Sequence, residues 1–75
     1  MAFNFDIKER IAVLSESGNG AYATEVNMIS FNGAEPKLDI RKWDKRTDRM
    51  LKGIALSGEE VEALKKALLQ LEDES

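Results

Sequence analysis

The sequence predicts an α+β domain in which four antiparallel strands form a meander and one C-terminal helix follows. Three observations predict this fold class. Apolar and polar residues alternate in short stretches rich in β-branched and aromatic side chains up to residue 56. Turn-forming residues separate the stretches without a long linker, so neighbouring strands are expected to pair in chain order. The last segment then changes to helical spacing, and residues 1–75 are expected to form a single domain.

The first two strands are predicted on either side of a turn at residues 17–20. The first covers residues 3–15 with an irregularity near residues 8–10, and a short helix there is the alternative. The second runs from Tyr22 to about Phe31. Its alternation changes phase near the end, which indicates a bulge or burial on both faces. The first strand is supported by these apolar residues: Phe3, Phe5, Ile7, Ile11 and Val13.

The third and fourth strands are predicted at residues 37–43 and 50–56, joined by a polar loop. Pro36 can begin the third strand but cannot lie at its centre. Gly53 lies inside the fourth strand, where glycine often marks a bulge or a close approach of two backbones. Lys52 would then be held toward a ligand.

The C-terminal helix has the clearest local signature. Ser57 at the N-cap and Glu60 three residues later form a capping box. One apolar stripe follows, and it is expected to serve the core or a dimer contact: Val61, Leu64, Leu68 and Leu71. Leu69 lies off this stripe, either as an ordinary exposed leucine or as part of the dimer contact.

The composition excludes several classes of protein. The chain has no Cys and no His, which removes disulfides, the usual zinc spacings and the usual nucleophile–base pairs. We therefore expect no enzyme, no cofactor and no metal. No apolar run or N-terminal segment resembles a membrane span or signal peptide, so a cytoplasmic protein is expected, associated with the nucleoid if bacterial. Because so short a chain buries a small core, self-association into a homodimer is the remaining means of stabilisation.

Charge is unevenly distributed along the chain. The net charge is −3, yet residues 37–52 hold seven basic and three acidic residues, a block of +4 between two acidic segments. Such a block is a candidate electrostatic surface for nucleic acid. A charged hairpin that keeps the protein soluble is an equal alternative.

The third strand carries the main functional prediction. Alternation places Leu38 and Ile40 on one face, against the helix, and Arg41 and Trp43 on the other. A sheet covered by a single helix is expected to leave that second face open. Bases of single-stranded nucleic acid stack on aromatic rings, and basic groups pair with phosphates. The alternative is that Trp43 packs in a dimer interface or a cross-strand cluster.

The same residues resemble a known family. Lys37-Leu-Asp-Ile-Arg-Lys-Trp43, a polar loop ending at Met50, Lys52-Gly-Ile-Ala-Leu-Ser57 and a helix with an acidic start resemble the single-stranded-DNA-binding domain of transcriptional coactivators of the positive cofactor 4 type, especially its small bacterial members. The resemblance covers residues 31–71. It implies a homodimer held partly by its helices, with two curved antiparallel sheets as the DNA surface. It implies DNA contacts at these residues: Phe31, Arg41, Trp43 and Lys52.

The predicted function is single-stranded DNA binding with little sequence specificity, supporting transcription, replication or repair. Transcription or replication proteins are further expected partners. The alternatives are single-stranded RNA binding and a protein-interaction module that uses the open sheet face. The predicted nucleic-acid-binding residues are Phe31, Lys37, Arg41, Trp43, Lys45, Arg46, Arg49 and Lys52, with Tyr22 as a further stacking surface.

Overall fold

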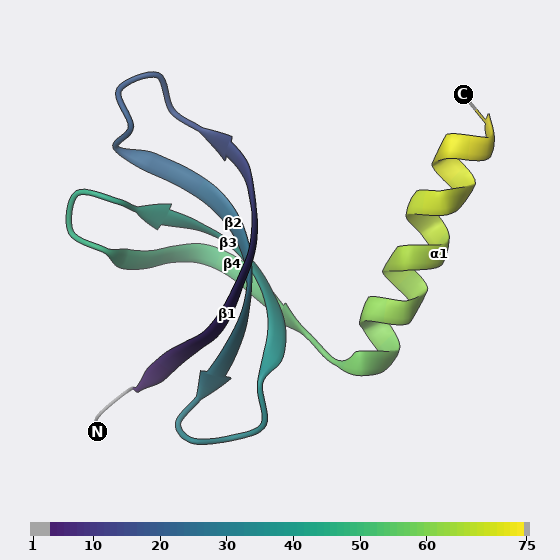
Figure 1. The fold of residues 1–75 in the computed structure, drawn as a ribbon, viewed down its shortest axis with the longest axis horizontal. Helices are drawn as coiled ribbons and strands as arrows, with labels where there is room; N and C mark the ends of the chain where they lie inside the picture. Colours follow the sequence, from purple (N-terminus) through teal and green to yellow (C-terminus); the bar gives the residue numbers. More distant parts are fainter. Residues whose placement is uncertain (1–3, 75) are drawn as a thin grey trace.

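The computed structural model describes residues 4–74 and shows one four-stranded antiparallel sheet followed by one helix (Figure 1). The strands lie in the order β1-β2-β3-β4, so the predicted meander and fold class are confirmed. Phe3, predicted in the first strand, lies outside the described residues. The elements are β1 (Phe5–Glu16), β2 (Tyr22–Phe31), β3 (Lys37–Asp44), β4 (Arg49–Leu56) and α1 (Gly58–Glu74).

Strand β1 is irregular, as its sequence predicts. Its pairing with β2 shifts register at three places, the first two between Ile7 and Glu9 and between Arg10 and Ala12. The residues form a strand throughout, so the alternative of a short helix is wrong. Each shift leaves an extra residue in β1, which bends the strand and increases its twist.

The sheet is strongly curved. Phe5 pairs with Phe31 at one end of β2, whereas Trp43 pairs with Ala23 near the other end. Eight residues of extended strand span about 26 Å, yet the rings of Phe5 and Trp43 lie only 5.8 Å apart. The two rings can meet only if the sheet coils around them. Figure 1 shows both ends of the sheet bending away from the helix, so the concave side faces away from α1.

We call the concave side the inner face, made by alternate residues of β2 and β3: Ala23, Glu25, Asn27, Ile29, Phe31, Lys37, Asp39, Arg41 and Trp43. Much of this face is buried within the single chain, and Trp43 is only 1% exposed. The prediction that Trp43 stands on an open face is therefore wrong. Alternation predicted the correct side of the sheet for Trp43, but the curvature of the sheet buries the side chain on that side. The contact of Trp43 with Phe5 confirms the alternative of a cross-strand cluster.

Helix α1 begins on the convex side of the sheet, which we call the outer face. The predicted capping box is confirmed, because the Glu60 N–H donates to Ser57 Oγ at 3.3 Å and the Ser57 N–H donates to Glu60 Oε1 at 2.9 Å. Val61 lines a hollow of about 450 Å³ together with Leu38 and Leu56.

Beyond its first turns, α1 extends away from the sheet (Figure 1). Leu68 and Leu71 are 53% and 62% exposed. The expectation that the face of Leu38 and Ile40 packs against the helix therefore holds only at the helix start. The second half of the apolar stripe is uncovered in the single chain.

Gly53 confirms the predicted close approach. It pairs with Arg41, and a Cβ built on it would lie 1.9 Å from the Arg41 Cβ. The β3–β4 register shifts immediately beyond this pair. Only a residue without a side chain fits there.

Two features of the described residues concern membrane spans and metal sites. No helix within residues 4–74 is long and apolar enough to cross a membrane. In the same part of the chain, no three His, Cys, Asp or Glu side chains are grouped so that they could hold a metal ion.

Candidate nucleic-acid interface

Arg41 lies on the inner face in a fixed orientation. Its Nε and Nη2 donate to the two carboxylate oxygens of Asp39, each at 2.6 Å, and its Nη1 donates to the Leu51 carbonyl at 3.3 Å. The guanidinium carbon lies 5.7 Å from the centre of the Phe31 ring. The fully buried Asp39 carboxylate neutralises the charge of the Arg41 guanidinium. Arg41 therefore offers a fixed guanidinium plane beside an aromatic ring rather than a free cation.

Trp43 is buried beneath the inner face and packs against Phe5. Its ring packs at 58° to Phe5, and its indole N–H has no hydrogen-bond acceptor among the described residues. Its burial removes the ring surface that a stacked base would need. Trp43 therefore holds the curvature that brings the flanking groups together.

Lys45 also lies toward the inner face, although it belongs to the β3–β4 turn. Its Nζ donates to Glu25 Oε2 at 2.8 Å, and Asn27 Nδ2 donates to Glu25 Oε1 at 3.3 Å. Burial acts to raise the pKa of Glu25, but the hydrogen bonds from Lys45 and Asn27 outweigh it and hold the pKa below its ordinary value. The carboxylate thus stays ionised with its charge matched by Lys45.

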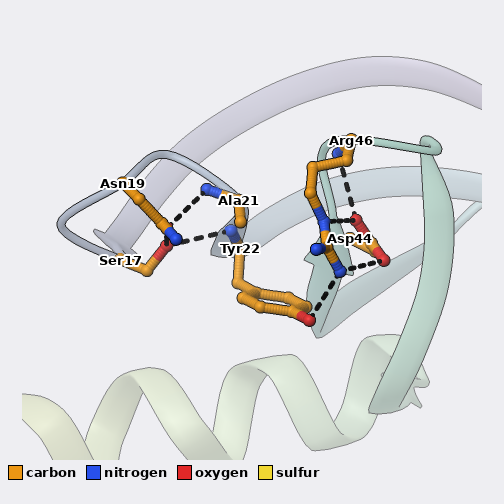
Figure 2. Close-up of polar contacts among 6 residues, drawn as sticks. All are labelled: Ser17, Asn19, Ala21, Tyr22, Asp44 and Arg46. Atoms are coloured by element: carbon orange, nitrogen blue, oxygen red, sulfur yellow. Dashed lines mark hydrogen bonds and ion pairs between the residues drawn. The ribbon is translucent and has the colours of Figure 1, made fainter.

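Arg46 and Tyr22 form a second aromatic–arginine pair, shown in Figure 2. The guanidinium carbon of Arg46 lies 5.0 Å from the centre of the Tyr22 ring, and its Nη2 donates to the Tyr22 hydroxyl at 2.7 Å. Asp44 accepts from the Arg46 side chain at 3.2 Å and from its backbone N–H at 3.0 Å. These hydrogen bonds lower the pKa of Asp44 and raise that of Arg46.

The β1–β2 turn positions Tyr22 for this contact. Ser17 Oγ accepts from the Tyr22 N–H at 3.0 Å, and Asn19 Oδ1 accepts from the Ala21 N–H at 3.0 Å (Figure 2). Such side-chain contacts to the backbone stabilise tight turns. Tyr22 leaves the turn with its ring on the outer face, opposite in direction to Ala23.

Four cations of β3 and β4 make no ion pair within residues 4–74: Lys37, Lys42, Arg49 and Lys52. Of the predicted cations, Arg41, Lys45 and Arg46 are each paired with a carboxylate instead. The +4 block of the sequence therefore consists of neutralised pairs together with unpaired cations.

The predicted site residues do not form one surface. Phe31, Lys37 and Arg41 lie on the inner face, whereas Tyr22 and Arg46 meet on the outer face, where Asp44 lies. Lys52 and Arg49 are exposed on β4, which is an edge of the sheet. Two of the predicted cations, Arg41 and Arg46, lie against two different aromatic rings, Phe31 and Tyr22.

Sequence reasoning missed the carboxylates that fix these cations, namely Asp39, Glu25 and Asp44. Two of the pairs follow a simple spacing, since Asp39 and Arg41, like Asp44 and Arg46, are two residues apart. Residues two apart share one face of a strand, so the pair of Asp39 and Arg41 could have been predicted from the sequence. The pair between Glu25 and Lys45 joins two distant segments and has no such signal.

Comparison with known proteins agrees with this geometry. The family model described as Transcriptional Coactivator p15 (PC4) matches residues 23–67, more than half of the chain. An uncharacterized protein of Treponema pallidum (strain Nichols) is 38% identical over 66 residues, which cover 88% of this chain and 76% of that protein. The matched region contains β3, β4 and the first half of α1, with nearly all of β2. The chain therefore belongs to the Transcriptional Coactivator p15 (PC4) family, a family of nucleic-acid-binding domains.

Proposed function

We propose that this protein is a homodimer that binds single-stranded DNA through its curved sheet, with little sequence specificity, in the cytoplasm. It would support transcription, replication or repair. One observation carries the proposal: aromatic rings with an arginine beside them, Phe31 with Arg41 and Tyr22 with Arg46, lie on a sheet that also carries unpaired cations. Rings and guanidinium planes accept stacked bases, and unpaired cations pair with phosphates.

The unpaired cations supply the phosphate contacts in this proposal. Lys37, Lys42, Arg49 and Lys52 have no internal carboxylate to displace, so a phosphate can replace water at each of them. Arg41 and Arg46 are oriented by Asp39 and Asp44 and supply planes for stacking. Trp43 acts indirectly, by holding the curvature of the sheet.

Self-association is part of the proposal because the single chain leaves the helix beyond its first turns without packing. The stripe that begins at Val61 continues through Leu68 and Leu71, which are exposed, and Ile54 on the outer face is exposed as well. Burying apolar surface of this kind is worth about 25 cal/mol per Å². A second copy of the chain, with the same stripe, is a matching partner.

A salt-dependent titration of labelled oligo-dT tests the binding. About four phosphate contacts on a single strand predict a slope of roughly −3 when log K is plotted against log salt concentration. Replacing Lys52 with Ala removes one contact and lowers the magnitude of the slope to roughly 2. Phe31→Leu keeps the apolar bulk but removes the ring, and we expect affinity to fall by about 1–3 kcal/mol for one lost stacked base.

The matched control is Lys65→Ala, which removes the same charge from α1 and leaves the sheet unchanged. We expect its slope to equal that of the wild type. A flat slope for the wild type, or Lys52→Ala and Phe31→Leu proteins that bind like Lys65→Ala, would overturn the proposed interface. Competition between oligo-dT and oligo-U separates DNA from RNA, because only RNA offers a 2′-hydroxyl.

A further inference from the structure

A second feature of the inner face is a hollow beside strand β1. A hollow of about 310 Å³ lies where the irregular strand β1 pairs with β2. Its volume corresponds to about ten water molecules, which is more than enough to admit one purine base. Its lining residues are Arg10, Ile11, Ala12, Val13, Glu25 and Asn27.

The shape of the hollow follows from the register shifts of β1. Arg10 pairs with Asn27 and Val13 pairs with Glu25, with a shift between Arg10 and Ala12. The pairing places these four side chains on the same side of the sheet, and the extra residue Ile11 widens the rim. Ile11 and Val13 are exposed, so the rim offers apolar contact to a flat ring.

The floor of the hollow presents hydrogen-bond acceptors. Glu25 accepts one bond on each carboxylate oxygen, which leaves further lone pairs of this ionised group unused. Asn27 is 1% exposed and donates to Glu25, while its own carbonyl oxygen accepts no hydrogen bond from the described residues. This oxygen is not among the fully buried unpaired atoms, so it can accept a hydrogen bond from a ligand that enters the hollow.

The rim adds a donor beside these acceptors. The Arg10 side chain is 62% exposed and lies 3.7 Å from Glu25, which is too long for a strong hydrogen bond. Its remaining N–H groups are available to a ligand. The hollow thus offers two neighbouring acceptors and one donor, with Lys45 matching the charge of Glu25.

We propose that this hollow takes a guanine base of single-stranded DNA, with Glu25 and Asn27 accepting from the N1–H and N2 amino groups and Arg10 donating to O6. The Watson–Crick edge of guanine carries two adjacent donors next to an acceptor. Thymine and adenine each carry a single donor group on that edge, and cytosine carries one donor group beside two acceptors. The assignment rests on the proposed single-stranded DNA binding and adds a base preference to it.

Fluorescence anisotropy with three labelled oligonucleotides of equal length tests the assignment at one salt concentration. The first is all thymine, the second carries isolated guanines spaced to prevent quadruplexes, and the third carries inosine at the same places. We expect the guanine strand to bind about fivefold tighter than the thymine strand, the lower end of discrimination by a bidentate contact. Inosine lacks the N2 amino group, so most of that gain is lost.

Variants then assign the preference to the hollow. Glu25→Gln removes the ionised acceptor, and we expect the guanine-to-thymine affinity ratio to fall to about one. Glu16→Gln removes the same charge at the exposed end of β1, outside the hollow, and should keep the wild-type ratio. Arg10→Lys keeps the positive charge but loses the several N–H donors of the guanidinium group. Because Arg10 is exposed, this variant should fold and tests the guanine-to-thymine affinity ratio even if Glu25→Gln does not fold.

The outcomes separate this inference from the proposed function. Equal affinities for guanine, inosine and thymine strands, in a wild-type protein that binds all three, overturn the guanine pocket and leave the proposed function intact. A ratio that survives both Glu25→Gln and Arg10→Lys also overturns it. If no strand binds even at low salt, the proposed function and the pocket are both wrong.

Discussion

At the scale of single residues, ion pairs decide what each cation of the sheet can do. Arg41 is held by two bonds to the fully buried Asp39, so breaking this pair would leave an unmatched buried carboxylate. Arg41 is therefore fixed by the fold, and its plane rather than its charge is what it offers a ligand. Exposed and unpaired Lys52 has the opposite character.

The sharpest prediction at this scale concerns Gly53. A methyl group there would lie 1.9 Å from the Arg41 Cβ and 2.7 Å from both the Arg41 Cα and the Ile40 carbonyl oxygen, so β3 and β4 would have to separate. We expect Gly53→Ala to lower the free energy of unfolding by about 1–3 kcal/mol. Chemical denaturation monitored by circular dichroism measures this change.

Gly58→Ala is the matched control for Gly53→Ala. A Cβ at Gly58 would have no atom within 4 Å, and alanine favours the helix that begins there. We expect this variant to be as stable as the wild type or slightly more stable. Equal stability of the Gly53→Ala and Gly58→Ala proteins would show that the close approach of β3 and β4 does not constrain the fold.

At the scale of the elements, the helix has a capping box at its start and meets the sheet only there. Only its first turns lie near β3 and β4, whereas the sheet is held by paired strands (Figure 1). The capping box between Ser57 and Glu60 satisfies two N–H groups at the helix start. The capping box therefore stabilises α1 through residues that are close in sequence.

We expect Ser57→Ala to destabilise the helix by about 1 kcal/mol, because the Glu60 N–H loses its side-chain acceptor. Thermal unfolding monitored by circular dichroism at 222 nm would show a lower midpoint. Ser15→Ala is the control, since Ser15 is exposed in β1 and makes no side-chain hydrogen bond in the described residues. Identical midpoints for the two variants would contradict the role of the cap.

At the scale of the whole molecule, the single chain is flat, with extents of 43 × 34 × 18 Å, and its helix leaves the sheet. The inner face is buried around Trp43 by its own side chains, whereas Ile54 on the outer face and the end of the helix stripe, at Leu68 and Leu71, are exposed. The sheet and the exposed end of the helix therefore have different roles in the proposed dimer. The curved sheet would meet nucleic acid, and the helix would meet the second copy.

We expect sedimentation of the wild type at micromolar concentration to give the mass of a dimer. Leu68→Glu places a charge on the exposed stripe and should shift the protein toward the monomer, because burying an unpaired carboxylate is costly. Gln70→Glu adds the same charge to α1 away from the stripe and should remain dimeric. A folded wild-type monomer, or equal behaviour of the two variants, would refute the proposed helix interface.

Much of the architecture could be predicted because it depends on local sequence patterns. The turns at residues 17–20 and 32–36, the alternation of Tyr22–Phe31 and the Ser57 cap each depend on residues close in sequence. Local rules also placed Arg41 and Trp43 on the same face, and predicted the irregularity of β1 and the close approach at Gly53.

The exposure of that face was not predictable in the same way. Whether Trp43 is open or buried depends on the curvature of the sheet, which brings Phe5 to it from the far end of β1. The pairing of Lys45 with Glu25 likewise depends on how the β3–β4 turn bends over β2. Curvature is a sum of small twists and bulges over many residues, so no single short pattern encodes it.

By itself, the sequence determined the order of the elements, the faces of each strand and the helix cap, because these are set by residues within a few positions of one another. Only the tertiary structure decided which cations remain unpaired, that Trp43 supports the sheet from inside, and that Glu25, Asn27 and Arg10 surround one hollow. These properties depend on contacts between residues far apart in the chain, which form only when the curved sheet brings them together.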